Sequence, residues 1–217
     1  MEYKCGWIVH FCRLSKVPDM IQEVARLVTG SDDLPGFLRN YFVGLLNCID
    51  TKMLRVDDQS LQKQALRCLE KLIEMIGPHL SAFVPKIMVL LMHAVEKESL
   101  QYEGLHVWNL FIRRLAQVSP SSLKHVSPQV VATLMPCLER EQHQHTPHLD
   151  IVVEILDQLI VKNRQLLEEQ LLELPMLPNL PSLDNVNQII QEACGSLWFR
   201  EQLQYVVVGF NRPSLSV

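Results

Sequence analysis

The sequence HLSAFVPKIMVLLMHAVEKE, at His79–Glu98, returns in altered form as LKHVSPQVVATLMPCLERE at Leu123–Glu141. The two copies align at an offset of 43 residues, which places Pro85 over Pro128. The aligned apolar pairs are Leu80 with Leu123, Ile87 with Val130, Met88 with Val131, Leu91 with Leu134 and Met92 with Met135. In each copy these residues recur every three or four positions, which predicts one face of an α-helix.

The neighbouring segments repeat as well, so the repeating unit is longer than one helix. Residues 100–118 match residues 58–76 at an offset of 42, and residues 149–161 match residues 105–117 at an offset of 44. A period of roughly 40–47 residues is typical of HEAT and armadillo repeats, whose units are helical hairpins that stack on one another. The sequence therefore predicts an all-α fold, a HEAT/armadillo-type α-solenoid of stacked antiparallel helical hairpins.

Turn-forming residues mark where further helices begin and end. Pro18 suits the first turn of a helix, and Gly30 stands where the same helix needs its C-terminal cap. Asp57 or Asp58 can cap the start of a helix that runs to Ile76. We therefore expect helices between each of these pairs of signals.

Five other segments are apolar enough to form helices. We expect helices at 7–14, 37–49, 164–172 and a last hairpin at 186–194 and 197–208. The inner stripe of the second helix would consist of Phe37, Tyr41, Leu45 and Cys48. We expect loops at 51–58 and 142–147, and an extended stretch at Leu174–Pro181, since its prolines restrain the backbone.

Composition indicates a globular, mainly helical protein. Hydrophobic residues make up 48% of the chain and charged residues 20%, with only eight glycines in 217 residues. The formal net charge is −4, so no overall basic field attracts nucleic acid or anionic lipid. We therefore expect no direct nucleic-acid partner and no membrane partner. We also expect no small-molecule partner.

The cysteines and the apolar runs indicate a soluble, intracellular protein. No Cys-x-x-Cys motif occurs, so we expect buried free thiols in a reducing compartment. No signal peptide is present, and the most apolar run, Ile87–Val95, is about half as long as a membrane span. The six cysteines are Cys5, Cys12, Cys48, Cys68, Cys137 and Cys194.

Both ends of the chain are apolar. Trp7-Ile-Val and Tyr205-Val-Val-Val would lie exposed on a solenoid, whose terminal hairpins normally carry polar caps. Residues 1–217 are therefore expected to form a single segment cut from a longer solenoid.

Three histidines form the one metal-like constellation of the sequence. His143, His145 and His148 lie within six residues, but no carboxylate or thiolate completes a closed site. We read them as part of a solvated loop between repeats. Nucleophile motifs and phosphate-binding glycine loops are absent, so we expect no catalytic, cofactor-binding or metal-binding residue and no cofactor.

Trp108 and Phe111 are the aromatic residues that most resemble a ligand-binding pair. They match Leu66 and Leu69 of the preceding repeat, which favours a place in the core.

Six stretches of the sequence are more specific than a generic helical repeat. They are FVGLLNCID at Phe42–Asp50, LQKQALRCLEKLIEMIGP at Leu61–Pro78, PKIMVLLMH at Pro85–His93, VSPSS at Val118–Ser122, VVEIL at Val152–Leu156 and NQIIQEA at Asn187–Ala193. These stretches resemble the UME region of ATR-type checkpoint kinases, and they are most similar to the plant members. The resemblance covers nearly the whole chain, with the UME part at about residues 31–141.

The resemblance implies a large serine/threonine kinase of the PI3-kinase-related class, which responds to single-stranded DNA and replication stress in the nucleus. Its catalytic domain lies far downstream, and neither a DFG-like triplet nor a catalytic loop occurs here. This chain is therefore expected to be a non-catalytic scaffold segment. The implied partners are an ATRIP-type regulatory subunit and a second copy of the kinase.

Three alternatives remain open from the sequence. The chain could be a free-standing HEAT adaptor, which only its wider context would distinguish. A nucleic-acid-binding solenoid needs basic residues aligned in every repeat, and Lys97 with Arg140 is the one such pair. An all-α enzyme would use the three histidines with a metal.

Overall fold

The computed structural model describes residues 17–30, 32–141 and 148–196 of the chain. Within these ranges nearly all of the backbone is helical and no strand occurs, so the predicted all-α fold is confirmed. The expectations for residues 7–14, 142–147 and 197–208 lie outside the described ranges. The α-helices are α2 (Val17–Thr29), α3 (Leu34–Ile49), α4 (Gln59–Ile76), α5 (Val84–Glu96), α6 (Gln101–Val118), α7 (Leu123–Glu141) and α8 (Leu149–Leu156).

Short helical turns connect or extend the α-helices. One π-helical turn extends α3 over Asp50–Leu54, and another extends α8 over Asp157–Val161. After the last 3-10 turn, residues 184–196 are helical. The 3-10 turns are Gly77–Phe83, Glu98–Leu100, Pro120–Ser122, Gln170–Leu172 and Pro181–Leu183.

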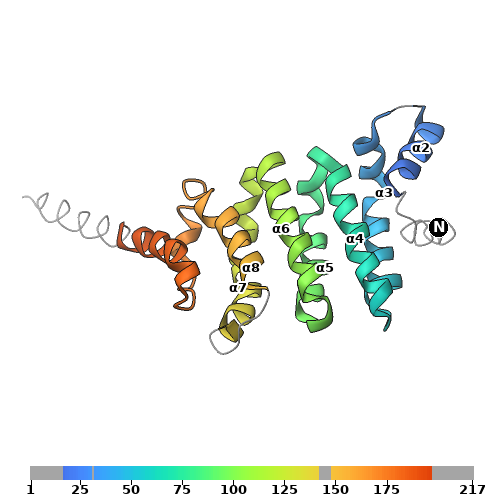
Figure 1. Cartoon of the computed structure of the whole chain (residues 1–217). Helices are drawn as coiled ribbons and strands as arrows, with labels where there is room; N and C mark the ends of the chain where they lie inside the picture. The colour runs from blue at the N-terminus through green and yellow to red at the C-terminus, as the bar shows by residue number, and fades with distance from the viewer. Residues whose placement is uncertain (1–16, 31, 142–147, 197–217) are drawn as a thin grey trace, which may run out of the picture.

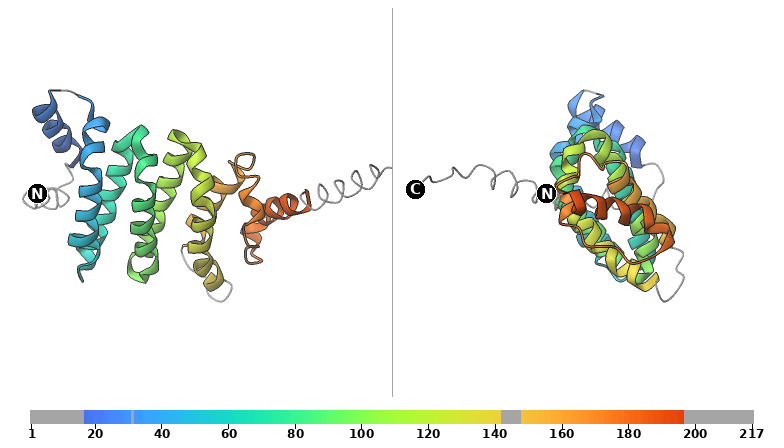
Figure 2. Two further views of the ribbon diagram at one scale, coloured as in Figure 1. Left: turned by 180° about the vertical axis from the view of Figure 1, so that it is seen from behind. Right: turned by 90° about the vertical axis from the view of Figure 1, so that its left-hand side faces the viewer.

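Consecutive helices pair as hairpins, and the hairpins stand side by side along one direction (Figure 1). α3 packs on α4, α5 on α6, and α7 on α8. One layer of the stack is formed by α4, α6 and α8, which contact one another in that order, and the other contains α3, α5 and α7. Seen from its end, the stack has the elongated outline of two helical layers (Figure 2). This arrangement confirms the predicted helical repeat.

The two copies of the repeated stretch occupy equivalent places in the core. Leu80 and Leu123 are both buried, as are Ile87 and Val130. In the partner helices, Trp108 and Phe111 of α6 are completely buried, like their counterparts in α4. The prediction that these aromatic residues belong to the core is confirmed. Burying a side chain of this size contributes several kcal/mol, so this layer is a main source of stability.

The predicted caps are present. Asp58 rather than Asp57 caps α4, since its Oδ1 accepts a hydrogen bond from the backbone N–H of Leu61 at 3.1 Å. Gly77 ends α4 with a φ of +54°, and Gly30 follows α2 with a φ of +65°. Both angles favour glycine, because a side chain would clash in this left-handed region.

The predicted inner stripe of α3 is partly wrong. Tyr41 is 45% exposed and Phe37 is half-buried, and their rings contact each other 5.0 Å apart. The helix is apolar on more than one side, so a second stripe at the same spacing faces α4 instead. The buried side chains of α3 are Leu38, Phe42, Leu45, Leu46, Cys48 and Ile49.

Two segments differ from the expected secondary structure. Residues 51–58 do not form a purely polar loop, because Met53 and Leu54 are buried in the π-helical turn after α3. Residues 164–172 do not form a regular helix: turns at 162–169 lead into a short 3-10 helix. In that second segment only Leu167 and Leu171 are buried, and so few core contacts do not offset the cost of starting a helix.

The cysteines differ in part from the expectation. Cys48 and Cys137 are buried thiols, and Cys194 is an exposed one. Cys68 is disulfide-bonded, so the prediction of a thiol at this position is wrong. Spacing along the sequence did not reveal this, since the pairing of cysteines depends on which segments meet in space.

The segment Gln59–Glu96 is long and apolar enough to cross a membrane, by length and composition alone. The turn at Gly77 divides it into α4 and α5, and both helices bury their apolar side chains in the core. Core packing therefore explains the apolar character of this segment.

Candidate interaction surface

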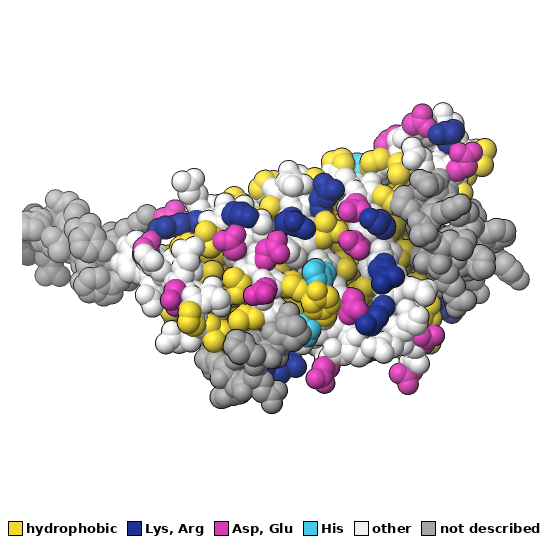
Figure 3. All heavy atoms as spheres, in the orientation of Figure 1, with side chains coloured by type: hydrophobic (Ala, Val, Ile, Leu, Met, Phe, Trp, Pro, Cys, Tyr) yellow, Lys and Arg dark blue, Asp and Glu magenta, His cyan; other side chains and the backbone are white. Residues whose placement is uncertain are grey.

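The layer formed by α4, α6 and α8 carries charges of both signs on its outer side. In Figure 3, basic and acidic side chains alternate along the part of the face where α4 lies. The opposite layer differs, since outward positions of α5 and α7 include Pro85, Val89 and Ala132. The basic stripe of α4 consists of Lys63, Arg67 and Lys71, and the acidic stripe of α8 and the following turn consists of Asp150, Glu154 and Asp157.

An ion pair crosses from α4 to α6 on this face. Lys63 Nζ lies 2.7 Å from Oε1 of Glu103, and Arg67 adds a second positive charge nearby. Partial burial of Glu103 raises the pKa of its carboxyl group. The hydrogen bond from Lys63, a backbone hydrogen bond and the two positive charges outweigh this effect, so the net pKa lies below its ordinary value.

Tyr102 and two histidines form a cluster beside this ion pair. The Tyr102 ring contacts His106 with a centroid distance of 4.6 Å and His148 at 5.6 Å. His148 therefore packs between helices, while His143 and His145 lie outside the described residues. In the part of the chain that the structure describes, no three histidine, cysteine or acidic side chains are grouped as metal ligands would be.

A buried carboxylate ties the first hairpin to the second. Asp50 is only 6% exposed and accepts a hydrogen bond from Arg55 Nε at 3.0 Å. Lys86 of α5 approaches the other carboxylate oxygen at 3.6 Å. These contacts link the turn that follows α3 to α5.

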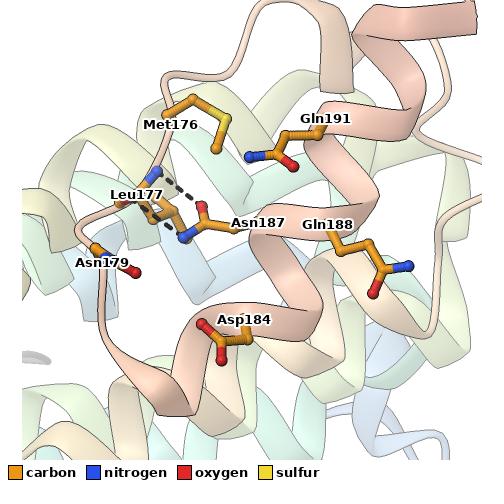
Figure 4. Close-up of a pocket in the computed structure, with 7 residues that line it drawn as sticks. All are labelled: Met176, Leu177, Asn179, Asp184, Asn187, Gln188 and Gln191. Atoms are coloured by element: carbon orange, nitrogen blue, oxygen red, sulfur yellow. Dashed lines mark hydrogen bonds between the residues drawn. The ribbon is translucent and has the colours of Figure 1, made fainter.

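Residues 175–180 have no regular secondary structure and Leu180 has extended backbone angles, in agreement with the extended stretch predicted at Leu174–Pro181. The Asn187 carboxamide holds Leu177 by two hydrogen bonds: Oδ1 accepts from the backbone N–H at 3.0 Å, and Nδ2 donates to the carbonyl at 3.3 Å (Figure 4). A pocket of about 450 Å³ opens between segment and helix. Its lining consists of Met176, Leu177, Asn179, Asp184, Asn187, Gln188 and Gln191.

Residues 37–138 match the family model of the UME (NUC010) domain. The matched residues include all of α4, α5 and α6, and therefore Lys63, Arg67 and Lys71 of the charged face. The acidic stripe of α8 and the pocket beside Asn187 lie beyond the matched residues.

Nearly the whole chain is similar to plant ATR kinases. It is 51% identical over 205 residues to the serine/threonine-protein kinase ATR of Arabidopsis thaliana. It is 52% identical over 205 residues to the same-named kinases of Oryza sativa subsp. japonica and subsp. indica. Each alignment covers 94% of this chain and 8% of the relative, so the chain spans about 8% of the relatives' length. The predicted similarity to ATR-type kinases is confirmed, and no solved structure matches the chain.

Sequence reasoning did not identify the two polar side chains that do most to shape this surface. Asp50 stood between the expected helix at 37–49 and the expected loop at 51–58, and Asn187 stood in an expected helix with no contact assigned to its side chain. A signal existed for Asn187, because prolines spaced every three residues leave backbone groups that need partners from elsewhere.

Proposed function

We propose that this chain is a non-catalytic helical scaffold segment of an ATR-like serine/threonine protein kinase. The observation that supports it most directly is the similarity over 94% of the chain to kinases of which it spans only 8%. The remaining length of such a kinase leaves room for a catalytic domain elsewhere. The proposal places the protein in the nucleus, in the checkpoint that responds to DNA damage and replication stress.

The proposed mechanism is docking by area and charge. Stacked hairpins present a long surface to a partner without requiring a deep pocket. On this surface Lys63 and Lys71 of α4 are already paired with Glu103 and Glu74, whereas Arg67 makes no ion pair with a described residue. A complementary partner therefore places an acidic residue over Arg67 and basic residues over Asp150 and Glu154 of α8. The proposed partners are an ATRIP-type regulatory subunit and a second copy of the kinase.

The proposal also concerns the extent of the segment. We propose that residues 1–217 form one solenoid segment and that its UME-like region extends over about residues 31–141. Neither a DFG-like triplet nor a catalytic loop occurs in the sequence, so the chain by itself transfers no phosphate.

A binding assay with the full 217-residue chain tests the scaffold role. The chain is immobilised and its affinity for a plant ATRIP-type subunit is measured by interferometry. Arg67→Glu reverses a charge in the basic stripe and should weaken binding about tenfold or more, since like charges facing each other cost several kcal/mol.

The matched control is Arg39→Glu, which reverses an exposed charge on α3 in the other layer. It should leave the affinity unchanged. Absence of binding by the unaltered chain, or equal loss in both variants, contradicts the charged face as the docking surface. Tight, salt-dependent binding of single-stranded DNA would favour the nucleic-acid alternative instead.

A further inference from the structure

One wall of the pocket is formed by the proline-rich segment, through Met176, Leu177 and Asn179. Residues 175–180 have no regular secondary structure, and Asn187 pairs with both the N–H and the carbonyl of Leu177. A neighbouring β-strand would offer the same two partners to this residue. The Asn187–Leu177 pair therefore shows that a carboxamide on this helix can bind the main chain of an extended segment.

Other polar groups around the pocket are still available. Asn179, Asp184 and Gln191 are exposed, and their side chains make no hydrogen bond or ion pair with residues 17–30, 32–141 or 148–196. Figure 4 shows the Gln191 carboxamide extending from the helix toward Met176. Gln188 instead extends away from the segment and donates to Glu192 Oε1 at 2.9 Å.

The spacing along the helix matches that of an extended peptide. Asn187 and Gln191 are one turn apart, which is about 6 Å along the axis, close to the roughly 6.6 Å between alternate residues of an extended chain. Asp184 and Gln191 are about 10 Å apart along the axis, which corresponds to three extended residues. A peptide along this helix could therefore meet a carboxamide at one residue and the carboxylate three residues away.

We propose that this pocket binds an extended segment of a partner protein that carries a lysine or arginine. The Gln191 and Asn179 carboxamides pair with its main chain, and the Asp184 carboxylate pairs with its basic side chain. The lining contains no lysine or arginine to compete for Asp184. Met176, which is 47% exposed, supplies an apolar contact beside them. The inference rests on the proposed scaffold role, since it names the chemistry of one partner segment.

Fluorescence anisotropy with the full chain tests the pocket. The probe is a fluorescein-labelled heptapeptide, Gly-Thr-Val-Lys-Val-Thr-Gly, blocked at both ends, and the comparison peptide has glutamate in place of lysine. The lysine peptide should bind at least about tenfold more tightly, as expected when one charge-assisted hydrogen bond is lost and a repulsion is introduced. Asp184→Asn should remove most of that difference, and Gln191→Ala should weaken both peptides.

Two matched variants control for general effects of these changes. Asp57→Asn removes an exposed carboxylate far from the pocket, and Gln165→Ala removes an exposed carboxamide outside its lining. Both should bind the lysine peptide like the unaltered chain, and all four variants should keep its melting temperature. Equal binding of the two peptides, or normal binding by Asp184→Asn and Gln191→Ala, overturns the proposal.

Failure of this inference is distinct from failure of the scaffold role. A chain that binds the regulatory subunit but not the lysine peptide overturns the pocket alone. A chain that binds the peptide through Asp184 but no protein partner overturns the scaffold role and leaves the pocket standing.

Discussion

Gly104 of α6 and Ala94 of α5 lie so close that a Cβ at position 104 would be 3.2 Å from the Ala94 Cβ. Val95 Cγ2 would be 3.3 Å away, so both neighbours would have to move. Gly104→Val should therefore lower the free energy of unfolding by about 1–3 kcal/mol, through overpacking of the α5–α6 interface. Urea unfolding of the full chain, followed by circular dichroism, measures the change.

Gly44 of α3 provides a control, because adding a side chain there should raise rather than lower the free energy of unfolding. An added Cβ there meets no atom within 4 Å, so Gly44→Ala gains helix propensity without a clash. It should raise the free energy of unfolding by about 0.5–1 kcal/mol. Destabilisation by this variant, or an unchanged stability in Gly104→Val, would contradict the packing described for the two positions.

Trp108→Ala should lower the free energy of unfolding by about 3–5 kcal/mol, because it leaves a large cavity between α4, α6 and α8. Thermal melts and urea midpoints measure the loss. The Trp108 Nε1 is buried without a hydrogen-bond partner, so Trp108→Phe removes an unsatisfied donor and part of the volume. The phenylalanine variant should lose much less stability than the alanine variant, and equal losses would contradict a role based on volume.

The hairpins could be predicted because the same apolar spacing occurs in two segments that are one repeat apart. Leu91 and Leu134, one repeat apart, are both buried, so the apolar pattern determines which side of each hairpin faces its neighbours. This pattern failed in α3, where Tyr41 and Phe42 are both apolar and adjacent. Packing against other elements decides that Phe42 is buried and Tyr41 is not: the Phe42 ring lies 4.7 Å from that of Phe83, in the turn before α5. The sequence of α3 contains no information about that choice.

The polar contacts of the candidate site could not be predicted for a related reason. Asp50 and Lys86 are far apart in the sequence, and their contact depends on the angle between two hairpins. Asn187 reaches Leu177 only because the prolines hold the intervening segment extended against the helix. Such contacts follow from tertiary geometry, whereas residue periodicity reports only on single helices.

Asp50→Asn should lower the free energy of unfolding by about 1–3 kcal/mol, because it weakens hydrogen bonds made to a buried charge. Lys86→Met removes the ammonium group that faces Asp50. The variant with both substitutions completes a double-mutant cycle. Since the two groups are in contact, the cycle should show a coupling of at least about 0.5 kcal/mol. Additive losses in the double variant would show that Lys86 contributes independently of Asp50.

Acid should destabilise the fold partly through Glu103 and Glu192. The pKa of Glu103 is lowered on balance, as burial raises it less than its hydrogen bonds and positive neighbours lower it. The pKa of Glu192 is lowered by hydrogen bonds from Gln188 and Arg164. A lowered pKa in the folded state contributes stability above the unfolded value of about 4.3, and this contribution is lost as the pH falls through the folded value.

Glu103→Gln should therefore make stability less dependent on pH below about 4.5 than in the unaltered chain. Urea midpoints measured between about pH 3 and pH 7 give this dependence. Glu173→Gln is the matched control, since its exposed carboxylate makes no ion pair with a described residue. The control should follow the unaltered chain throughout, because its carboxylate has no folded-state partner to lose on protonation. If Glu103→Gln shows the same acid dependence as the control, the Lys63–Glu103 pair does not persist in solution.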